Sequence, residues 1–354
     1  MTQRMTVAVT GLNATDNPGP GVSVIRALRE AEDIDLRVVG LAYDAMEPGI
    51  YAKDIVDDVY LIPYPSEGVE ALEARLREIH AILPLDVVIP TLDAELPSFI
   101  ALRETLNDLG IGTFLPSREQ FDLRSKVHLQ ELGEDADIDV PRAKTVIDVG
   151  DMYRVHEEIP YPFYVKGLYY GASLARGVDE AVMAFHRVVA TWGLPVIVQQ
   201  AVDGEEFDVV AVGDGDGGLV GAVPMKKTFI TDKGKGWAGI TVKDPALRAI
   251  AERFMAHTRW RGPLEIEVMK SHDGRYYLLE VNPRFPAWTY LSAGAGMNLP
   301  AAVLRLAAGL EPDIASEYRV GTMFVRISLD QIASLDDFQK LATAGALSRS
   351  GVAL

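Results

Sequence analysis

The sequence of 354 residues contains no cysteine, which excludes disulfides, thiolate metal sites, iron–sulfur clusters and cysteine nucleophiles. Basic residues are also scarce: 34 Lys and Arg stand against 51 Asp and Glu, a formal net charge of −17. Because so acidic a surface repels phosphate backbones and anionic lipid, we expect no nucleic-acid and no membrane partner. An anionic ligand would therefore need a locally basic pocket.

Long apolar runs are missing as well. No run reaches the roughly 18 residues that a membrane span needs. Residues 1–11 hold only a short apolar core, too little for a secretory signal. With 48% hydrophobic residues we expect a sizeable core, and with neither a span nor a signal we expect a cytoplasmic protein. The length predicts two to three domains of about 150 residues each.

Several common motifs are absent. No G-x-G-x-x-G follows the first apolar run, no Gly-Lys-Ser/Thr ends the glycine-rich stretch 234–239, and there is no G-x-S-x-G. The six histidines show no spacing of four residues, so we expect no histidine zinc site. The loop 17–22 precedes a predicted helix and has two open interpretations, a flexible helix entry or a loop that holds a substrate.

Apolar runs and helical spacings alternate in the first third of the chain. Strands are predicted at 5–11, 36–41 and 86–90, and helices near 22–28, 69–83 and 99–109. This alternation is typical of a parallel sheet with helices on both faces. Residues 1–117 are therefore predicted to form one doubly wound α/β domain.

The most informative stretch is a predicted β-hairpin over residues 262–284. An Asp-Gly turn at 273–274 joins two runs of alternating residues. Because side chains alternate between the faces of a strand, Glu267, Glu280 and Asn282 can meet on one face. Two carboxylates and an amide oxygen suit Mg²⁺ (or Mn²⁺) held together with nucleotide phosphates. The alternative is a solvent-facing acidic strand pair, which the neighbouring apolar residues disfavour.

Two lysines have positions that suit phosphate binding. Lys126 lies in a predicted helical stretch that ends near Gly133, and Lys166 closes a predicted strand over 161–166. The small-residue loop 167–173 follows Lys166 directly and suits the wrapping of phosphates. Further strands are predicted at 195–202 and 207–212. A single lysine of this kind is more often a surface residue, but two beside a glycine loop are a more specific pattern.

The stretch from Lys226 to Lys243 is rich in lysine and glycine. We expect a mobile basic loop here. It either becomes ordered over a terminal phosphate or an acidic substrate, or it is a solvated lysine loop.

The constellation resembles the ATP-grasp superfamily, which includes biotin carboxylase, the halves of carbamoyl phosphate synthetase and amino acid ligases. Glu280-Val-Asn-Pro-Arg284 matches the family's specific Glu-x-Asn-x-Arg metal-binding signature. The resemblance covers about residues 5–310 and implies an α/β (α+β grasp) fold. Its parts are a pre-ATP-grasp domain (1–117), a first grasp part with a mobile lid (118–200), a catalytic subdomain with the metal site (201–310) and a C-terminal tail (311–354). The tail either caps the grasp domain or forms a dimer contact.

The resemblance also implies roles for individual residues. Its metal ligands are Glu267, Glu280 and Asn282. Its nucleotide-binding residues are Lys126, Lys166, Gly171, Ser173, Gln199, Gln200, Val202 and Glu206. Gln199 departs from the family pattern, in which glutamate is commoner at this position. Because ATP is highly anionic, we expect Lys226, Lys227 and Arg284 to act as catalytic cations, with Arg284 stabilising an acyl phosphate.

The function that the resemblance implies is an ATP-dependent ligase. It would activate a substrate carboxylate as an acyl phosphate and join it to an amine, releasing ADP and phosphate. Expected partners are small-molecule or peptide carboxylates and amines, and a homodimer is one expected state. Residues 284–288 and Tyr290 either line the acceptor pocket or pack under the hairpin. Two alternatives stay open, a bicarbonate-using carboxylase or carbamoyl-phosphate-type enzyme and a non-catalytic nucleotide-binding scaffold.

Overall fold

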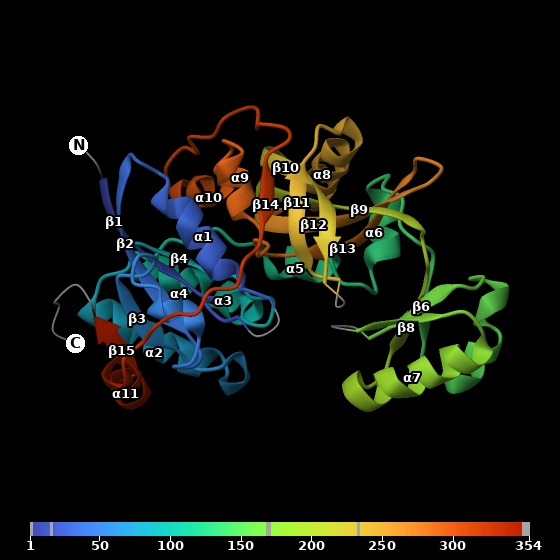
Figure 1. Ribbon diagram of the computed structural model, residues 1–354, viewed down its shortest axis with the longest axis horizontal. Coiled ribbons are helices and arrows are strands. Elements are labelled where there is room, and N and C mark those ends of the chain that lie inside the picture. Colours follow the sequence, from blue (N-terminus) through green and yellow to red (C-terminus); the bar gives the residue numbers. More distant parts are fainter. Residues whose placement is uncertain (1–2, 15–16, 168–170, 232–233, 349–354) are drawn as a thin grey trace.

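The computed structural model describes residues 3–14, 17–167, 171–231 and 234–348. These residues form three β-sheets of five, four and six strands. In Figure 1 the N-terminal sheet lies at the left, the four-stranded sheet at the lower right and the six-stranded sheet above and between them. None of the described helices is long and apolar enough to cross a membrane.

The N-terminal sheet is doubly wound, as the sequence predicts. Its strand order is β15-β3-β2-β1-β4, and β1–β4 are parallel. The strands are β1 (Gln3–Val9), β2 (Ile34–Ala42), β3 (Asp58–Leu61), β4 (Val87–Ile89) and β15 (Ala346–Ser348). Helix α1 (Pro20–Arg29) covers one face, and α2 (Val69–Ile82), α3 (Leu96–Ala101) and α4 (Arg103–Asp108) cover the other. Strand β3 was not predicted from the sequence, and the helix predicted near 99–109 is two short helices.

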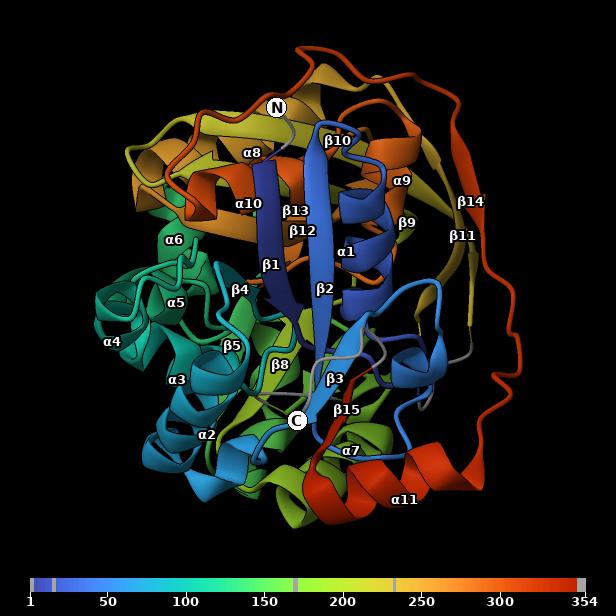
Figure 2. The same ribbon diagram turned by 90° about the vertical axis from the view of Figure 1, so that its left-hand side faces the viewer.

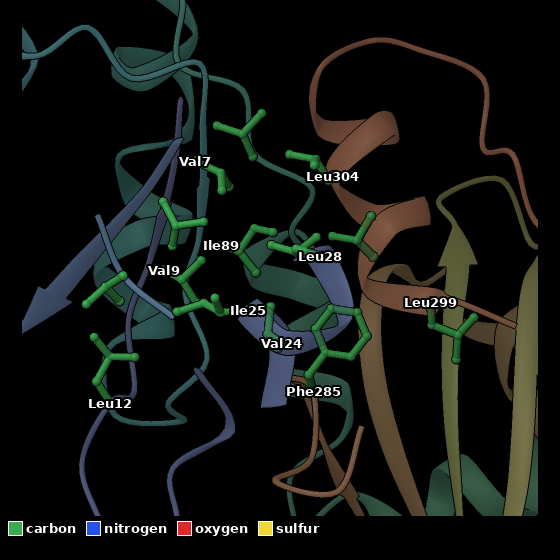
Figure 3. Packing of buried hydrophobic residues seen from close by; sticks show 14 of the residues in the cluster. Val7, Val9, Leu12, Val24, Ile25, Leu28, Ile89, Phe285, Leu299 and Leu304 are labelled. Carbon is green, nitrogen blue, oxygen red and sulfur yellow. The ribbon is translucent and has the colours of Figure 1, made fainter. Parts of the chain in front are cut away.

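Alternation along β1 explains why both faces are covered. Val7 and Val9 pack with α1 and with Leu304 of the C-terminal half, whereas Ala8 faces the cluster on the α2 side. Figure 3 shows Val7, Val9 and the α1 residues beside Phe285 and Leu304. The first face of the sheet is therefore also the contact between the N-terminal domain and the rest of the chain.

The four-stranded sheet, called the lid sheet below, has the order β5-β8-β6-β7. Its strands are β5 (Ala143–Val146), β6 (Phe163–Lys166), β7 (Ala172–Ala175) and β8 (Val196–Gln200). Helix α7 (Val178–Trp192) packs on one face through Ala181, Phe185 and Val188. Short 3₁₀ turns at Val149–Tyr153 and Val155–Glu157 complete this small core.

The six-stranded sheet is antiparallel, with the order β13-β12-β9-β10-β11-β14. Its strands are β9 (Gly204–Asp214), β10 (Leu219–Ile230), β11 (Gly236–Thr241), β12 (Arg261–Ser271), β13 (Tyr276–Asn282) and β14 (Met323–Val325). The predicted hairpin is β12 and β13. The expectation of a loop over 226–243 is wrong for its described residues, most of which belong to the β10–β11 pair; residues 232–233 lie outside the described part.

Helices cover both faces of the six-stranded sheet. Helices α6 (Leu129–Asp135) and α8 (Pro245–Thr258) pack on one face, and α9 (Tyr290–Gly294) and α10 (Leu299–Ala307) lie between the other face and the N-terminal domain. Lys126 is not helical, because it lies in the turn between α5 (Arg118–Leu123) and α6. Two more 3₁₀ turns occur at Pro48–Tyr51 and Pro65–Glu67.

The C-terminal tail joins two of the sheets. Strand β14 pairs with β11, and after helix α11 (Leu335–Ala344) strand β15 pairs with β3 of the N-terminal sheet. Figure 2 shows this path along the outer edge of the molecule. Contacts within the chain therefore agree with the first of the two expected roles of the tail, which is to cap the grasp domain.

Candidate functional site

One face of the six-stranded sheet changes from apolar to acidic along β9. Val210 and Val212 are apolar and pack toward the N-terminal domain, whereas Asp208 and Glu206 follow on the same face. On the neighbouring strands, Glu267 lies opposite both Asp208 and Glu280, and Glu265 lies opposite Asn282. The period of two therefore gathers carboxylates from three strands. Asp208, Glu265 and Asn282 are each less than a tenth exposed, which rules out a solvent-facing acidic surface.

Lys227 of β10 neutralises part of this cluster. Its Nζ lies 3.2 Å from Glu206 Oε2, 3.2 Å from Asp208 Oδ1 and 3.6 Å from Glu267 Oε2. Burial alone would lower the pKa of Lys227, but the carboxylates of Asp208 and Glu267 outweigh it and raise that pKa. Burial raises the pKa of Asp208 well above its usual range. The lysine therefore stays charged and fixes the carboxylates around it.

Arg284 connects the cluster to the N-terminal domain. Its Nε donates to Asp93 Oδ2 at 2.9 Å, and its Nη1 donates to Glu265 Oε2 at 3.0 Å. Glu265 also accepts from Trp288 Nε1 at 2.7 Å. Burial works to raise the pKa of Asp93, but Arg284 outweighs it and the pKa is lowered. Asp93 follows β4, so this ion pair joins the carboxyl end of the N-terminal sheet to the six-stranded sheet.

Two lysines approach the same carboxylates from outside the six-stranded sheet. Lys126 Nζ lies 3.3 Å from Glu280 Oε1. Lys166, the last residue of β6, donates to Gln199 Oε1 at 2.5 Å. Burial and the nearby Lys126 charge lower the pKa of Lys166 to about 8, with Glu280 and Glu267 opposing the shift. The site therefore lies between the lid sheet and the six-stranded sheet, where Lys126 and Lys166 approach the carboxylates from outside the six-stranded sheet.

Comparisons with known proteins agree with this geometry. Residues 194–327 match the family described as ATP-grasp in the biosynthetic pathway with Ter operon. This part of the chain is therefore similar to the ATP-grasp family. Carbamoyl phosphate synthase large chain from Micrococcus luteus is 27% identical over 273 residues, which are 72% of this chain and 24% of that protein. This chain thus spans about a quarter of the length of that relative.

Solved structures share the fold at low sequence identity. L-amino acid ligase from Bacillus licheniformis is 18% identical with a TM-score of 0.64, covering 88% of this chain and 76% of the ligase. The biotin carboxylase domain dimer of 2-oxoglutarate carboxylase from Hydrogenobacter thermophilus, solved with MgADP and bicarbonate, is 16% identical with a TM-score of 0.70. The match covers 90% of this chain and 73% of that domain. These likenesses confirm the ATP-grasp fold.

The predicted adenine and lid residues lie on or beside the lid sheet. Gln199 is buried on β8, and Gln200 Oε1 accepts from the Arg142 backbone N–H at 3.3 Å, where the chain enters and leaves that sheet. Val202 lies between β8 and β9. Gly171, with a φ of 84°, and Ser173 stand at the start of β7. The rest of the predicted glycine loop, residues 168–170, lies outside the described residues.

Lys226 is the one predicted site residue that the structure places on the other face. It neighbours Lys227 in β10, so its side chain points away from the cluster and pairs with Glu205 at 2.5 Å. Phe285 and Trp288 are buried, with Phe285 in the core beside α1 and Trp288 bonded to Glu265, which favours the packing interpretation of this segment. We therefore leave Lys226 out of the proposed site.

The donor set fits a divalent cation only when phosphate oxygens complete it. Glu267 and Glu280 lie directly opposite each other, and Asn282 adds an amide, so every donor is a hard oxygen. Among the described residues, no group of three or more Asp, Glu or His side chains is arranged to hold a metal by itself. The Asn282 amide N–H group donates to Glu265 at 3.1 Å and to Glu267 at 2.9 Å. An ion here would therefore be shared between these side chains and a nucleotide.

Arg124 is a cation near the site that the sequence analysis missed. It lies in the same turn as Lys126, with its guanidinium carbon 4.3 Å from the centre of the Phe121 ring. Its buried Nε has no hydrogen-bond partner among the described residues. Burial lowers the pKa of Arg124, and the charges of Asp93 and Glu280 oppose that shift. The short spacing from Lys126 was the only signal in the sequence.

Proposed function

We propose that this protein is an ATP-dependent ligase that activates a carboxylate as an acyl phosphate and joins it to an amine. The observation that carries the proposal is the partly buried array in which Glu267, Glu280 and Asn282 face Lys126 and Lys166. A carboxylate cluster with opposing lysines suits a phosphate chain and its divalent cation. We propose a small molecule or a peptide for both substrates and a cytoplasmic location.

Charge explains how this chain would hold a nucleotide. ATP carries about four negative charges, and the chain itself has a formal net charge of −17, so phosphates need local cations. Lys126 and Lys166 would bind the phosphates, and Gln199, Gln200, Val202 and Glu206 would line the adenine and ribose side. Mg²⁺ held by Glu267, Glu280 and Asn282 would neutralise charge that develops on the phosphates in the transition state.

In the proposed reaction, an oxygen of the substrate carboxylate attacks the γ-phosphorus and the bond to the β–γ bridging oxygen breaks. ADP leaves, and the acyl phosphate forms. The amine then attacks the acyl carbon, phosphate leaves and the amine loses a proton. Arg284 would stabilise the negative charge of the acyl phosphate and of the tetrahedral intermediate that the amine forms from it. Its bonds to Asp93 and Glu265 fix its orientation. Ser173 on β7 and Gly171 just before that strand would cover the phosphates and exclude water.

A second candidate has support from the comparisons. Both the carbamoyl phosphate synthase relative and the biotin carboxylase neighbour, which was solved with bicarbonate, resemble this chain over most of its length. In this alternative, bicarbonate replaces the substrate carboxylate and carboxyphosphate forms instead of an acyl phosphate. The site described above serves either reaction, because both begin with transfer of the γ-phosphoryl group to a carboxylate oxygen.

The test is product detection by mass spectrometry together with ADP release. The protein would receive Mg²⁺, ATP and pooled amino acids and dipeptides, with and without bicarbonate. A mass equal to two substrates minus water, formed with ADP, would establish the ligase. Bicarbonate-dependent ADP without that product would favour the carboxyphosphate reaction. ATP binding without turnover in every pool would contradict both proposals and favour a non-catalytic scaffold.

Two lysine variants make the test specific to the site. Lys126→Met removes a cation 3.3 Å from Glu280, and we expect turnover to fall by about 10² or more, the range found when one transition-state donor is lost. Lys226→Met changes the same residue type on the opposite sheet face and should keep near wild-type turnover. Equal losses in both variants would mean that the face has been wrongly assigned.

A further inference from the structure

Exposed apolar side chains concentrate in one short part of the chain. Between residues 320 and 335, seven large hydrophobic side chains are each more than half exposed, from 54% for Val320 to 87% for Ile332. The full set is Val320, Met323, Val325, Ile327, Leu329, Ile332 and Leu335. We call this set the tail patch. Single exposed hydrophobics are ordinary, but seven along one short segment of the chain favour an interaction surface.

The tail patch begins on an unprotected sheet edge. Strand β14 is the last strand of the six-stranded sheet, and it pairs on one side with β11. Met323, Val325, Ile327 and Leu329 occur at every second position, as in a strand with one apolar face. Val325 lies opposite Ala238, which lies opposite Phe229, also 61% exposed, so the apolar face continues onto β10.

Inward contacts fix the alternate residues of the same segment. Phe324 packs against the core, and the Arg326 guanidinium donates to the carbonyl oxygens of Gly236 and Ala287, both at 3.1 Å. The backbone at the start of the tail patch is therefore held in place while Val325 and Ile327 point outward. In Figure 2 this segment runs from β14 to α11 along the outside of the molecule.

We propose that the tail patch is the self-association surface of this protein and that its partner is a second copy of the same chain. If each of the seven side chains exposes on the order of 100 Å², the tail patch has an exposed area of about 700 Å². This area is close to the roughly 800 Å² that each partner contributes to a standard interface. An isologous dimer needs a surface complementary to itself, and an exposed edge strand satisfies this because it can pair antiparallel with its own copy.

The charge distribution favours the same partner. Two chains of formal net charge −17 repel each other over most of their surface. Within residues 320–335, however, the ionisable side chains are one arginine and one aspartate, Arg326 and Asp330, so this segment is neutral. Contact between two copies therefore costs less electrostatic repulsion here than at an average part of the surface.

The primary experiment is sedimentation velocity on the full chain. We expect the wild-type protein to sediment as a dimer at about 10 μM, and the double variant Ile327→Asp/Leu329→Asp to sediment as a monomer. Both changed residues are more than 70% exposed, so the melting temperature of the dilute monomer should not change. The matched control is Met183→Asp on α7, which is 61% exposed outside the tail patch and should leave the dimer intact.

A cross-linking experiment locates the contact independently. Because the sequence has no cysteine, Ser328→Cys introduces a unique thiol in the middle of the tail patch, and Ser66→Cys introduces one in an exposed turn of the N-terminal domain. A short bismaleimide should join two chains through residue 328 and not through residue 66. A wild-type monomer at 100 μM, or a dimer that persists in the double variant, would overturn the proposal.

Discussion

Lys166 combines a positive charge with a partly buried position at the end of β6. Burial and the charge of Lys126 lower its pKa from 10.5 to about 8, so its ammonium loses a proton within an accessible pH range. The folded protein thus favours the neutral amine. Below pH 8 the folded protein carries the full free-energy cost of a charged, buried Lys166. As the pH rises from 8 to 10.5, the folded state loses this proton before the unfolded state does, and the free energy of unfolding increases.

This titration predicts a pH dependence of nucleotide binding. If Lys166 binds phosphate, its neutralisation weakens Mg-ADP binding, so the Kd should be constant from pH 7 to about 8 and then rise toward about tenfold per pH unit. Isothermal titration calorimetry from pH 7 to 9.5 measures the effect. The control is Lys166→Arg, because a guanidinium stays charged over this range and should give a flat profile. A flat wild-type profile would show that Lys166 does not bind the phosphates.

Site residues could be predicted from the sequence where their partners lie close to them in the chain. Glu267, Glu280 and Asn282 follow from the alternation of one hairpin, and the structure brings them together. Arg284 and Asp93 are 191 positions apart, so no local pattern could pair them. Buried acids need compensating positive charge, and Lys227 and Arg284 already supply part of it through contacts with Asp208 and Glu265 that no local pattern indicates.

At the scale of secondary structure, long elements with a clear period were predicted and short edge elements were not. The helix over 69–83 and the 262–284 hairpin agree closely with α2 and β12–β13. Strands β14 and β15 have three residues each and lie at sheet edges, and neither was predicted from the sequence. The β10–β11 pair was not predicted because of its lysines. Strands that carry polar residues for a binding site have a sequence pattern like that of a solvated loop.

Helix α11 holds the tail against the N-terminal domain, which predicts a stability effect far from the site. Leu341 is fully buried in the core that contains β1 and α1. Leu341→Ala removes three side-chain carbons and leaves a cavity, so we expect a loss of about 2–5 kcal/mol in the free energy of unfolding. Urea unfolding followed by circular dichroism measures it. Gln339→Ala, an exposed change on the same helix, should stay within about 0.5 kcal/mol of the wild type.

At the scale of the whole molecule, the proposed site is an assembly of all three sheets. Asp93 comes from the N-terminal domain, Lys166 from the lid sheet and Glu267 from the six-stranded sheet. The opposite charges in this assembly are paired with each other in the structure. A divalent cation alone would have to displace lysine and arginine from these carboxylates, whereas Mg-ADP supplies phosphates that pair with the released cations. Metal and nucleotide are therefore expected to bind together.

Thermal unfolding tests this coupling. Mg²⁺ alone should leave the melting temperature nearly unchanged, whereas Mg-ADP at 100 times its Kd should stabilise the protein by about 2.7 kcal/mol. Glu280→Gln weakens the metal site, so the stabilisation by Mg-ADP should fall while the protein stays folded. The control is Glu205→Gln, the same chemical change on the opposite face of the same sheet, where the carboxylate contacts Lys226. A large shift with Mg²⁺ alone, or equal losses in both variants, would place the metal elsewhere, because only Glu280 faces Lys126 across the proposed nucleotide site.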